Sequence, residues 1–414
     1  MIYHPSIHIS APEDNYLVAP SDPAIGAHIS ADDAKQLAYH LAFSGLGYVA
    51  PNPLVGCVIV SADGRLLGRG AHQTFGGKHA EVIAIEDALH NFSNAKLQAA
   101  TIYVTLQPCD HHGKTPPCTE LIIRHRLAKV VYDLSDPNPN INSVETLQAN
   151  GITVQRCEFN RDIHWLDEAY FWRYNQQPPD RPYVAMKIAA THNGMYAQAG
   201  QGRQWLTTVR ARQYGHYLRQ RYDAILVGRN TLELDNPMLN VRLPLQTLRH
   251  PFKIILAHPD KLATLERLQV LTHEPDKTIF VIPAGSHVSA KASRLLAHTL
   301  AVPSDDTAGY HLPSLLAKLQ TQFGITSLLV EGGGKVWQSF WAAGVVDKLH
   351  LFQSNSETTS AKAQYWQQQV KLSTAHLSAT RLVWLDADRL YEASCSYQGK
   401  ERLAAARNPT LAHM

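Results

Sequence analysis

A proline-rich segment at residues 177–182 (QPPDRP) divides this chain into two stretches, in each of which strand-like and helical patterns alternate. Proline fixes φ and lacks a backbone donor, so a helix or a central strand does not run through such a segment. Alternating strands and helices are typical of α/β folds. Because 414 residues exceed what one hydrophobic core usually serves, we expect two α/β domains.

The first stretch begins with a well-marked helix. Ser30 and Asp33 form the pattern of a capping box, and the apolar residues that follow repeat with helical period to about residue 41. An Asp63-Gly64 turn then joins two apolar runs into a hairpin. The predicted helices are 30–41, 79–90 and 117–127, and the predicted strands are 55–60, 66–70, 101–106 and 129–133.

The second stretch carries strand-like runs separated by helical stretches. These runs are residues 183–190, 224–228, 252–257, 278–282 and 327–331. Residues 1–28 show neither period and are expected to form a flexible extension, and residues 401–414 a flexible tail. We therefore expect a first domain at 29–176 and a second at 177–400.

The composition excludes several classes of protein. Hydrophobic residues make up 45% of the chain and charged residues 18%, which argues against disorder and against a coiled coil. A net charge of +3 without a basic stripe predicts no nucleic-acid partner. No apolar run reaches the roughly 18 residues of a membrane helix, and the N-terminus lacks a signal pattern. We expect a cytoplasmic protein with no membrane partner.

The strongest functional pattern is His79-Ala80-Glu81, followed by Pro108-Cys109 and by Cys118. One imidazole and two thiolates fill three corners of a tetrahedral zinc site and leave the fourth for water, as in catalytic sites. The odd count of five cysteines also favours metal binding over a disulfide framework. The sequence therefore predicts one zinc ion per chain, bound by His79, Cys109 and Cys118, which lowers the pKa of water to about 7.

Glu81 is the predicted catalytic residue. Its carboxylate can take a proton from the water and deliver it to a ring nitrogen and to departing ammonia. We expect His79 and Cys109 to lie at helix N-termini, where the helix dipole favours thiolate and hydroxide. His-x-Glu with Pro-Cys-x-x-Cys is the signature of zinc nucleobase deaminases. Here the polar residues 110–117 (DHHGKTPP) separate the two cysteines and form a loop that could close over a charged substrate.

Further segments extend this pattern: residues 52–56 (NPLVG), His72, residues 76–81 (GGKHAE) and residues 111–118 (HHGKTPPC). Together they resemble the bifunctional deaminase-reductase family of riboflavin biosynthesis, and the last segment distinguishes that family among zinc deaminases. The resemblance implies an N-terminal domain with a cytidine-deaminase-like three-layer fold. It implies a C-terminal domain with a dihydrofolate-reductase-like fold.

In that family the deaminase acts on a diaminopyrimidinone that carries a ribosylamino 5-phosphate, and it replaces the exocyclic 2-amino group by oxygen. The resemblance implies that Asn52, His72 and Lys114 hold this substrate. Two positions depart from the family, since Gln107 and Asp110 stand where Glu and Ser are usual. Neither is a predicted ligand, but either change could alter the loop that orients the substrate.

The second domain has no Gly-x-Gly-x-x-Gly after its first strand, so a Rossmann-type site is not predicted. Residues 328–335 (LLVEGGGK) instead form a strand that runs into glycines at a helix start. There, backbone N–H groups can approach a phosphate closely. The resemblance implies that this domain uses NADPH to reduce the ribose to a ribityl chain, which gives 5-amino-6-(5-phosphoribitylamino)uracil.

Matches in family order over residues 183 to about 350 imply two sets of ligand-binding residues. The implied cofactor-binding set is Ala189, Trp205, Thr231, Asp235, Gly333, Gly334, Lys335, Val336, Trp337, Gln338 and Ser339. The implied substrate-binding set is Arg203, Arg219, Leu239, Arg242 and Glu331. Guanidinium groups suit the 5-phosphate because they bind phosphate bidentately. Departures from the family stand at Asn193, Arg203 and Asn236.

The sequence leaves three alternatives open. A zinc deaminase of cytidine, a free base or tRNA adenosine would show Cys-x-x-Cys or a basic stripe with exposed aromatics, and both are missing. The departures at Asn193 and Arg203 allow a C-terminal scaffold without catalysis. A structural zinc site would need a fourth protein ligand, such as His111 or His112. The resemblance favours the bifunctional enzyme, a homo-oligomer that acts on a small-molecule substrate.

Overall fold

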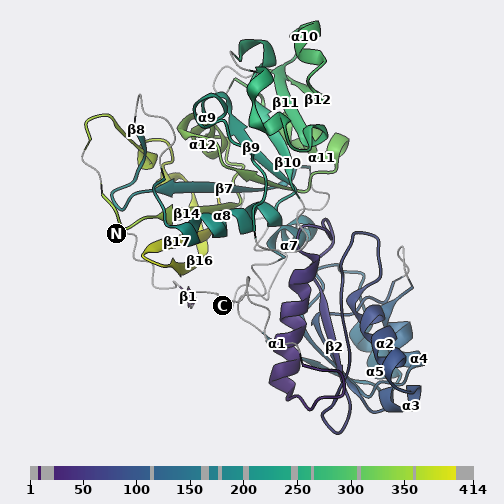
Figure 1. Ribbon diagram of the computed structural model, residues 1–414. Helices are drawn as coiled ribbons and strands as arrows, with labels where there is room; N and C mark the ends of the chain where they lie inside the picture. The colour runs from purple at the N-terminus through teal and green to yellow at the C-terminus, as the bar shows by residue number, and fades with distance from the viewer. Residues whose placement is uncertain are drawn as a thin grey trace. The chain divides into compact units, whose positions relative to one another are not determined.

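The computed structural model divides the chain into two compact units, Asp14–Pro178 and Met1–Glu13 together with Pro179–Met414 (Figure 1). It describes residues 8–10, 23–111, 116–159, 167–175, 180–198, 205–243, 250–262, 265–304, 309–357 and 360–397. The expected tail at 401–414 lies outside these residues, as do Lys114 and Arg203. Within the described residues, no helix has the length and apolar character that crossing a membrane requires.

The N-terminal unit is a five-stranded sheet in the order β3-β2-β4-β5-β6. Its strands are β2 (Gly56–Val60), β3 (Leu66–Ala71), β4 (Thr101–Leu106), β5 (Lys129–Leu134) and β6 (Thr153–Arg156). Its helices are α1 (Ala31–Ala42), α2 (Ala80–Asn91), α3 (Asn94–Leu97), α4 (Cys118–Arg124), α5 (Ser143–Ala149) and α7 (Glu168–Asn175). β2 pairs antiparallel with β3 and β4, whereas β4, β5 and β6 are parallel.

Helices cover both faces of this sheet, so the unit has three layers (Figure 1). Alternate residues of β2 point to opposite faces: Val58 packs in the cluster under α1, and Ile59 in the cluster under α2, α4 and α5. The capping box at the start of α1 is confirmed, because Ser30 and Asp33 each accept the other's backbone N–H. The predicted three-layer, cytidine-deaminase-like fold is confirmed.

The C-terminal unit contains a ten-stranded sheet and a small two-stranded sheet. Its strands are β1 (His8–Ser10), β7 (Tyr183–Ala190), β8 (Met195–Gln198), β9 (Ala224–Gly228), β10 (Phe252–Leu256), β11 (Thr278–Pro283), β12 (His298–Val302), β13 (Ser327–Val330), β14 (Lys348–Gln353), β15 (Ala363–Tyr365), β16 (His376–Leu385) and β17 (Asp388–Ser396). Its helices are α8 (Val209–Arg221), α9 (Arg229–Asp235), α10 (Ala290–Ser293), α11 (Leu312–Phe323) and α12 (Gly334–Ala342).

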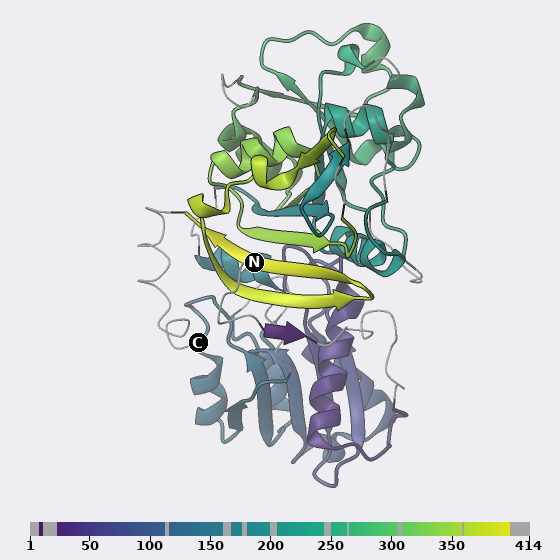
Figure 2. The ribbon, with the colours of Figure 1, turned by 90° about the vertical axis from the view of Figure 1, so that its left-hand side faces the viewer.

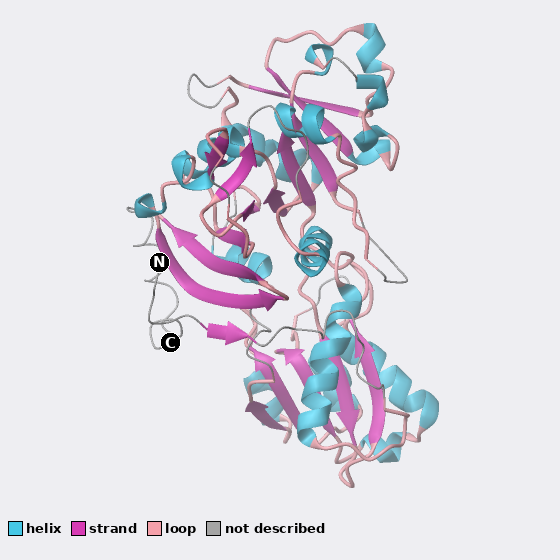
Figure 3. Cartoon of the chain, turned by 60° about the vertical axis from the view of Figure 1, so that its left-hand side comes forward, coloured by secondary structure: helices cyan, strands magenta, loops and turns pink. Residues whose placement is uncertain are grey.

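The ten strands run in the order β1-β16-β17-β14-β7-β13-β9-β10-β11-β12. In this spatial order, the seven strands from β14 to β12 are all parallel. The long β16–β17 hairpin pairs with β14 through β17, in antiparallel orientation (Figures 2 and 3). The five strands predicted in this stretch are confirmed, as is the dihydrofolate-reductase-like fold class. The sequence interpretation did not identify β14 or the hairpin.

The expectation that residues 1–28 form only a flexible extension is wrong at two places. The Gly26 N–H donates to the Leu66 backbone oxygen and His28 forms a β-bridge with Arg65, and a strand forms at residues 8–10. This strand is β1, which pairs in parallel with β16 at the edge of the large sheet, Ile9 opposite Leu382 (Figure 2). A three-residue edge strand has too few side chains to show a period, and its pairing partner lies more than 370 residues away along the chain. Local pattern therefore gives no sign of it.

The large sheet has two distinct faces. Met186 of β7 and Leu349 of β14 lie in the main apolar core, together with α11 and α12. Their neighbours Lys187 and His350, which are opposite each other in the β7–β14 ladder, lie on the other face. Arg219 of α8 contacts Glu331 on that second face, directly after β13. Polar and charged side chains thus gather between α8 and the sheet.

Candidate active sites

The first site is built at the start of α2, which packs unusually close to β3. A Cβ atom on Gly70 would lie 2.5 Å from the backbone oxygen of Ala80, so only glycine permits this approach. The close packing fixes the first turn of the helix against the sheet. His79 is the N-cap of α2, as predicted, and Glu81 lies in its first turn.

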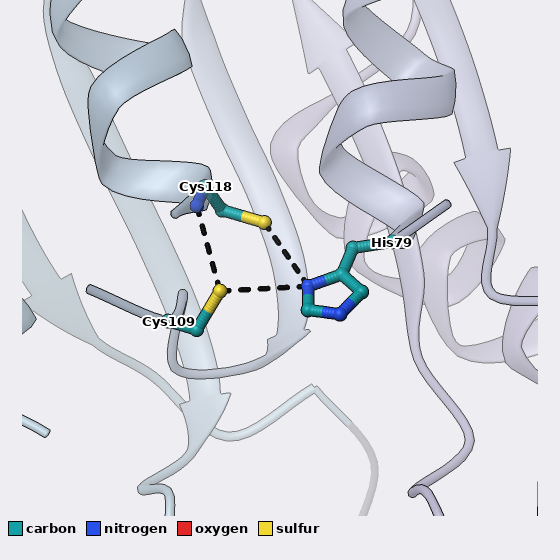
Figure 4. Close-up of side chains that lie close together, drawn as sticks. All are labelled: His79, Cys109 and Cys118. Carbon is teal, nitrogen blue, oxygen red and sulfur yellow. Dashed lines mark hydrogen bonds between the residues drawn. The ribbon is translucent and has the colours of Figure 1, made fainter. Parts of the chain in front are cut away.

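Cys109 and Cys118 reach His79 from the loop after β4 and from the start of α4 (Figure 4). His79 Nδ1 lies 3.5 Å from Cys109 Sγ and 3.3 Å from Cys118 Sγ. Cys109 is not at a helix N-terminus, as the sequence had suggested, but in the loop after β4; the helix starts at Cys118. The first amide of α4 still donates to Cys109 Sγ, at 3.4 Å, so the thiolate is stabilised as expected.

Without a metal ion, the local electrostatics favour ionisation of one of the two thiols, because the hydrogen bond with Cys109 raises the pKa of Cys118. The hydrogen bond with Cys118 lowers the pKa of the Cys109 thiol to about 4. The hydrogen bond with Cys109 raises the pKa of His79 to about 9. A metal ion replaces that imidazole proton when it binds, so metal affinity is expected to decrease as the pH falls.

A zinc ion fits these residues. The three ligand atoms lie within 4.8 Å of one another, and one nitrogen with two sulfurs is a donor set that zinc prefers. The carboxyl of Glu81 is 3% exposed, and its Oε2 has no hydrogen-bond partner in the described structure. Burial raises the pKa of this carboxyl. An unsatisfied buried oxygen is costly unless a ligand or water completes it, so Glu81 is set up to receive a proton.

Two of the residues implied to hold substrate lie beside this cluster. The His72 ring packs edge-on against the His79 ring at 5.7 Å between centroids. His72 Nδ1 donates to the backbone oxygen of Lys78 at 2.9 Å, and its Nε2 accepts from Asn52 Nδ2 at 3.1 Å. Burial lowers the pKa of His72, which keeps the ring in this neutral form. The third residue, Lys114, lies outside the described residues.

Gln107 and Asp110, the two departures from the family, connect the loop after β4 to the segment that follows β5. Gln107 Nε2 donates to Ser143 Oγ at 3.0 Å, and Asp110 Oδ2 accepts from the Asn142 backbone N–H at 2.8 Å. The same segment brings in Asp136, whose pKa is raised by burial and also by Cys109. Sequence interpretation missed Asp136. Because β4 and β5 are parallel, the residues that follow them meet at one edge of the sheet. The position of Asp136 shortly after a predicted strand was therefore the sequence feature that could have identified it.

One other group in the described part of the chain places three possible ligand atoms within 4.8 Å, namely His250, His273 and Glu274. Two contacts oppose a cation there. The Val241 N–H donates to His250 Nδ1 at 3.0 Å, which puts the proton of a neutral ring on Nε2. Lys277 Nζ lies 2.8 Å from Glu274 Oε1 and supplies the positive charge. This group is therefore not a second zinc site.

We expect the purified protein to bind one zinc ion per chain and the Cys118→Ser variant to lose most of it, since a hydroxyl is a poor ligand for zinc. Elemental analysis of the protein after gel filtration measures this. Glu274→Gln is the matched control and should keep the full amount. Zinc retained by Cys118→Ser would contradict the assigned ligand set.

The second site lies at the carboxyl end of β13, on the α8 face of the large sheet. Arg219 Nε and Nη2 donate to Glu331 Oε1 and Oε2 at 2.7 and 2.9 Å. The Nζ of Lys187 is 4.0 Å from Glu331 Oε2. The adjacent arginine holds the pKa of Glu331 at about 2, against the opposing effect of burial. Arg219 and Glu331, both implied to bind substrate, are thus brought together as a bidentate ion pair.

The glycines after Glu331 form the expected strand-to-helix turn, with Gly333 as N-cap of α12. Gly228, at the end of the neighbouring β9, lies against Val336, and Thr231 Oγ1 lies close to Gly333. The carboxyl ends of β9 and β13 therefore present backbone N–H groups side by side, an arrangement that suits phosphate.

The remaining implied cofactor residues differ in exposure. Lys335 and Gln338 are exposed, whereas Trp337 is 5% exposed and its ring packs against Tyr196 in the core. Leu239 from the substrate set is likewise in the core, at 2%. Trp205 is 61% exposed, with the Arg212 guanidinium 4.6 Å from its ring centre.

The other described members of the implied cofactor set lie on β7, α9 and α12. Ala189 shares the α8 face with Lys187, Asp235 ends α9, and Gly334 and Ser339 lie on α12. Arg203 lies outside the described residues.

The other departures keep local structural roles. Asn193 Oδ1 accepts from Thr191 Oγ1 at 2.7 Å in the turn between β7 and β8. Asn236 is the C-cap of α9 and lies in the left-handed region, φ 39°, which asparagine tolerates. Its side-chain amide donates to the Arg267 backbone oxygen at 3.2 Å, a bond that an ionised aspartate could not make.

Comparison with known proteins agrees with both halves of the chain. Residues 30–134 match the cytidine and deoxycytidylate deaminase zinc-binding region, and residues 182–355 match the RibD C-terminal domain. The riboflavin biosynthesis protein RibD of Bacillus amyloliquefaciens is 37% identical over 76% of this chain and 82% of its own length. RibD of Escherichia coli strain K12 is 33% identical over 76% of this chain and 85% of its own length.

Solved structures lead to the same family. The diaminohydroxyphosphoribosylaminopyrimidine deaminase/5-amino-6-(5-phosphoribosylamino)uracil reductase of Thermotoga maritima is 33% identical, with a TM-score of 0.72, and RibD of Acinetobacter baumannii is 28% identical, with a TM-score of 0.71. Each match covers 88% of this chain and 98% of the other. With a zinc deaminase domain followed by a reductase domain, this chain belongs to the RibD family of bifunctional riboflavin biosynthesis enzymes.

Proposed function

We propose that this chain catalyses two consecutive steps of riboflavin biosynthesis. In the first, water replaces the 2-amino group of 2,5-diamino-6-(5-phosphoribosylamino)pyrimidin-4(3H)-one and ammonia leaves. In the second, NADPH reduces the ribose of that product to a ribityl chain. The observation that carries the proposal is the cluster of His79, Cys109 and Cys118 beside the buried carboxyl of Glu81.

In the deamination, His79, Cys109 and Cys118 would hold zinc, which supplies an activated water at neutral pH. Glu81 takes the proton of that water and passes it to the ring nitrogen and then to the leaving amino group. Its buried position and raised pKa suit a group that must both accept and release a proton near neutral pH. Asn52, His72 and Lys114 are assigned to the substrate.

In the reduction, a hydride adds to C1 of the ribose, the C1–O bond of the ring breaks, and the ring oxygen gains a proton. The protein's main contribution is to place the nicotinamide against C1. We assign the adjoining ends of β9 and β13, with Thr231 and residues 333–339, to the phosphates of NADPH. Ala189, Trp205 and Asp235 complete the proposed cofactor site.

We assign the substrate's ribose phosphate to the arginines near Glu331, apart from the residues that we assign to NADPH. Glu331 already occupies two donors of Arg219, so that arginine serves chiefly to hold Glu331 in place. Arg242 is exposed, and we propose that it binds the phosphate. Arg203 would be a further contact. Leu239 would shape the chain segment that carries Arg242. We retain residues 29–176 as the proposed deaminase domain and 177–400 as the proposed reductase domain.

The test is a coupled assay on the purified full chain. Ammonia release from the diaminopyrimidinone ribosyl phosphate is followed first, and NADPH oxidation is followed in the same reaction. We expect both signals, in equal amounts. Ammonia without NADPH oxidation would mean that the C-terminal unit is a scaffold, and the absence of ammonia would rule out the substrate assignment.

We further propose a cytoplasmic homo-oligomer. The structure shows no disulfide among the five cysteines, which is typical of a protein from a reducing compartment. The family resemblance supports the oligomer. Cell fractionation and sedimentation velocity of the full chain test the two statements separately.

A further inference from the structure

Asn240 contacts both arginines of the proposed reductase site. Arg219 Nη1 donates to the Asn240 backbone oxygen at 3.1 Å, and Arg242 Nη1 donates to its side-chain Oδ1 at 2.5 Å. Asn240 is itself 7% exposed. The preceding residue, Leu239, adopts φ 52°, an uncommon conformation for a leucine, and is held by the apolar cluster under β9 and β10. This turn of the backbone at Leu239 directs the Asn240 backbone oxygen toward Arg219 and its Oδ1 toward Arg242.

The two arginines differ in what they can offer a ligand. Arg219 is largely buried and its charge is matched by Glu331. Arg242 is exposed, so its guanidinium can meet an anion from solution. The amide oxygen of Asn240 restrains that guanidinium without adding a negative charge. An aspartate at position 240 would also accept a hydrogen bond from Arg242 Nη1, but it would cancel the positive charge of the guanidinium that attracts a phosphate.

The backbone of Arg242 is held as well. Its N–H donates to His216 Nδ1 at 3.2 Å, which requires an unprotonated nitrogen. Burial and the nearby Arg219 and Arg242 lower the pKa of His216 to about 4, so the ring is neutral at physiological pH. Both ends of the Arg242 residue are therefore fixed by neutral partners, His216 at the main chain and Asn240 at the guanidinium.

We propose that Asn240 is a positioning residue of the reductase, which orients Arg242 toward the 5-phosphate of the substrate. This inference rests on the proposed function, in which Arg242 binds that phosphate. A long arginine side chain loses considerable rotamer entropy when it is fixed, and a pre-formed contact removes part of that cost from substrate binding. The effect should therefore appear in the KM for the phosphorylated substrate and leave hydride transfer intact.

The experiment measures steady-state kinetics of the full chain, supplied with the deaminated ribosyl phosphate and NADPH. For Asn240→Leu, which has similar volume and no acceptor, we expect the KM for this substrate to rise about tenfold, as for the loss of one charge-assisted hydrogen bond. The kcat and the KM for NADPH should stay near the wild-type values. With the same substrate lacking its phosphate, Asn240→Leu and wild type should behave alike.

A double-variant cycle decides between positioning and a merely structural role. If Asn240 acts through Arg242, then Asn240→Leu should cause no further rise in KM in the Arg242→Met background. An additive rise, or an equal rise for the substrate without phosphate, would overturn the inference. If Arg242→Met alone leaves the KM for the phosphorylated substrate unchanged, the phosphate assignment itself fails. Asn240→Ala, which cannot overpack the site, must show the same selective rise if Asn240→Leu does not fold.

Discussion

Replacing Glu81 with glutamine should lower the rate of ammonia release by about 10²- to 10⁴-fold, the range typical for the loss of a general acid-base residue. Glutamine is nearly the same size as glutamate but cannot accept the proton of the attacking water. The carboxyl is buried, and its Oε2 has no hydrogen-bond partner in the described structure.

The readouts separate catalysis from metal binding. Glu81 lies in the first turn of α2 and is not among the three ligand side chains, so Glu81→Gln should bind zinc as the wild type does. NADPH oxidation should disappear when the assay starts from the undeaminated substrate and return when the deaminated substrate is supplied. Glu145→Gln, an exposed carboxylate on α5, serves as the control. More than about a tenth of wild-type ammonia release in Glu81→Gln would exclude Glu81 as the proton carrier.

Replacing Glu331 with glutamine should destabilise the C-terminal unit by about 3–5 kcal/mol, because it leaves the charge of Arg219 buried without its carboxylate. The side chains of Arg219 and Glu331 are 15% and 8% exposed, so solvent screens the pair only weakly. For a domain of this size the expected decrease in Tm is about 6–20 °C, measured by calorimetry on the full chain.

Two further variants test the cause of this loss. Arg219→Met combined with Glu331→Leu removes both charges and should recover much of the stability, because apolar residues can replace a buried ion pair. Glu233→Gln breaks the partly exposed pair with Arg229 in the same unit and should change stability by no more than about 1 kcal/mol. If Glu331→Gln is no more harmful than Glu233→Gln, the buried pair contributes little.

The same pair predicts a pH dependence. The pKa of Glu331 is about 2 in the folded chain, below the value of about 4.3 for an unfolded glutamate. The carboxylate therefore contributes stability that is fully present above about pH 4.3 and is lost as the pH falls toward 2. In the Glu331→Gln variant this part of the acid transition of the C-terminal unit should be absent.

Local sequence patterns predicted those features that depend on neighbouring residues. Ser30 and Asp33 marked the start of α1 because a capping box needs only residues three apart. His79, Glu81 and the two cysteines could be identified because zinc chemistry restricts ligand types and because the helix start fixes the His-x-Glu spacing. The apolar runs of the parallel strands were found because those strands are buried on both faces.

Contacts between distant segments could not be predicted in the same way. Arg219 and Glu331 are 112 positions apart, and no periodicity indicates that β13 carries Glu331 to α8. Arg219 was therefore assigned to the substrate from resemblance, whereas the structure gives two of its donors to Glu331. Asp136 approaches Cys109 only because β4 and β5 are adjacent and parallel.

The sequence by itself determined the zinc-binding residue types, the two α/β stretches, the helices α1, α2 and α4 and the strands with long apolar runs, since these follow from side-chain chemistry and from local burial periodicity. Tertiary structure alone decided the order of the ten strands, the pairing of β1 with β16, the loop position of Cys109 and the partners of Arg219 and Arg242. The physical reason is that strand order and ion pairing are set by which distant surfaces pack together, and the free energy of that packing is not encoded in any short stretch of the chain.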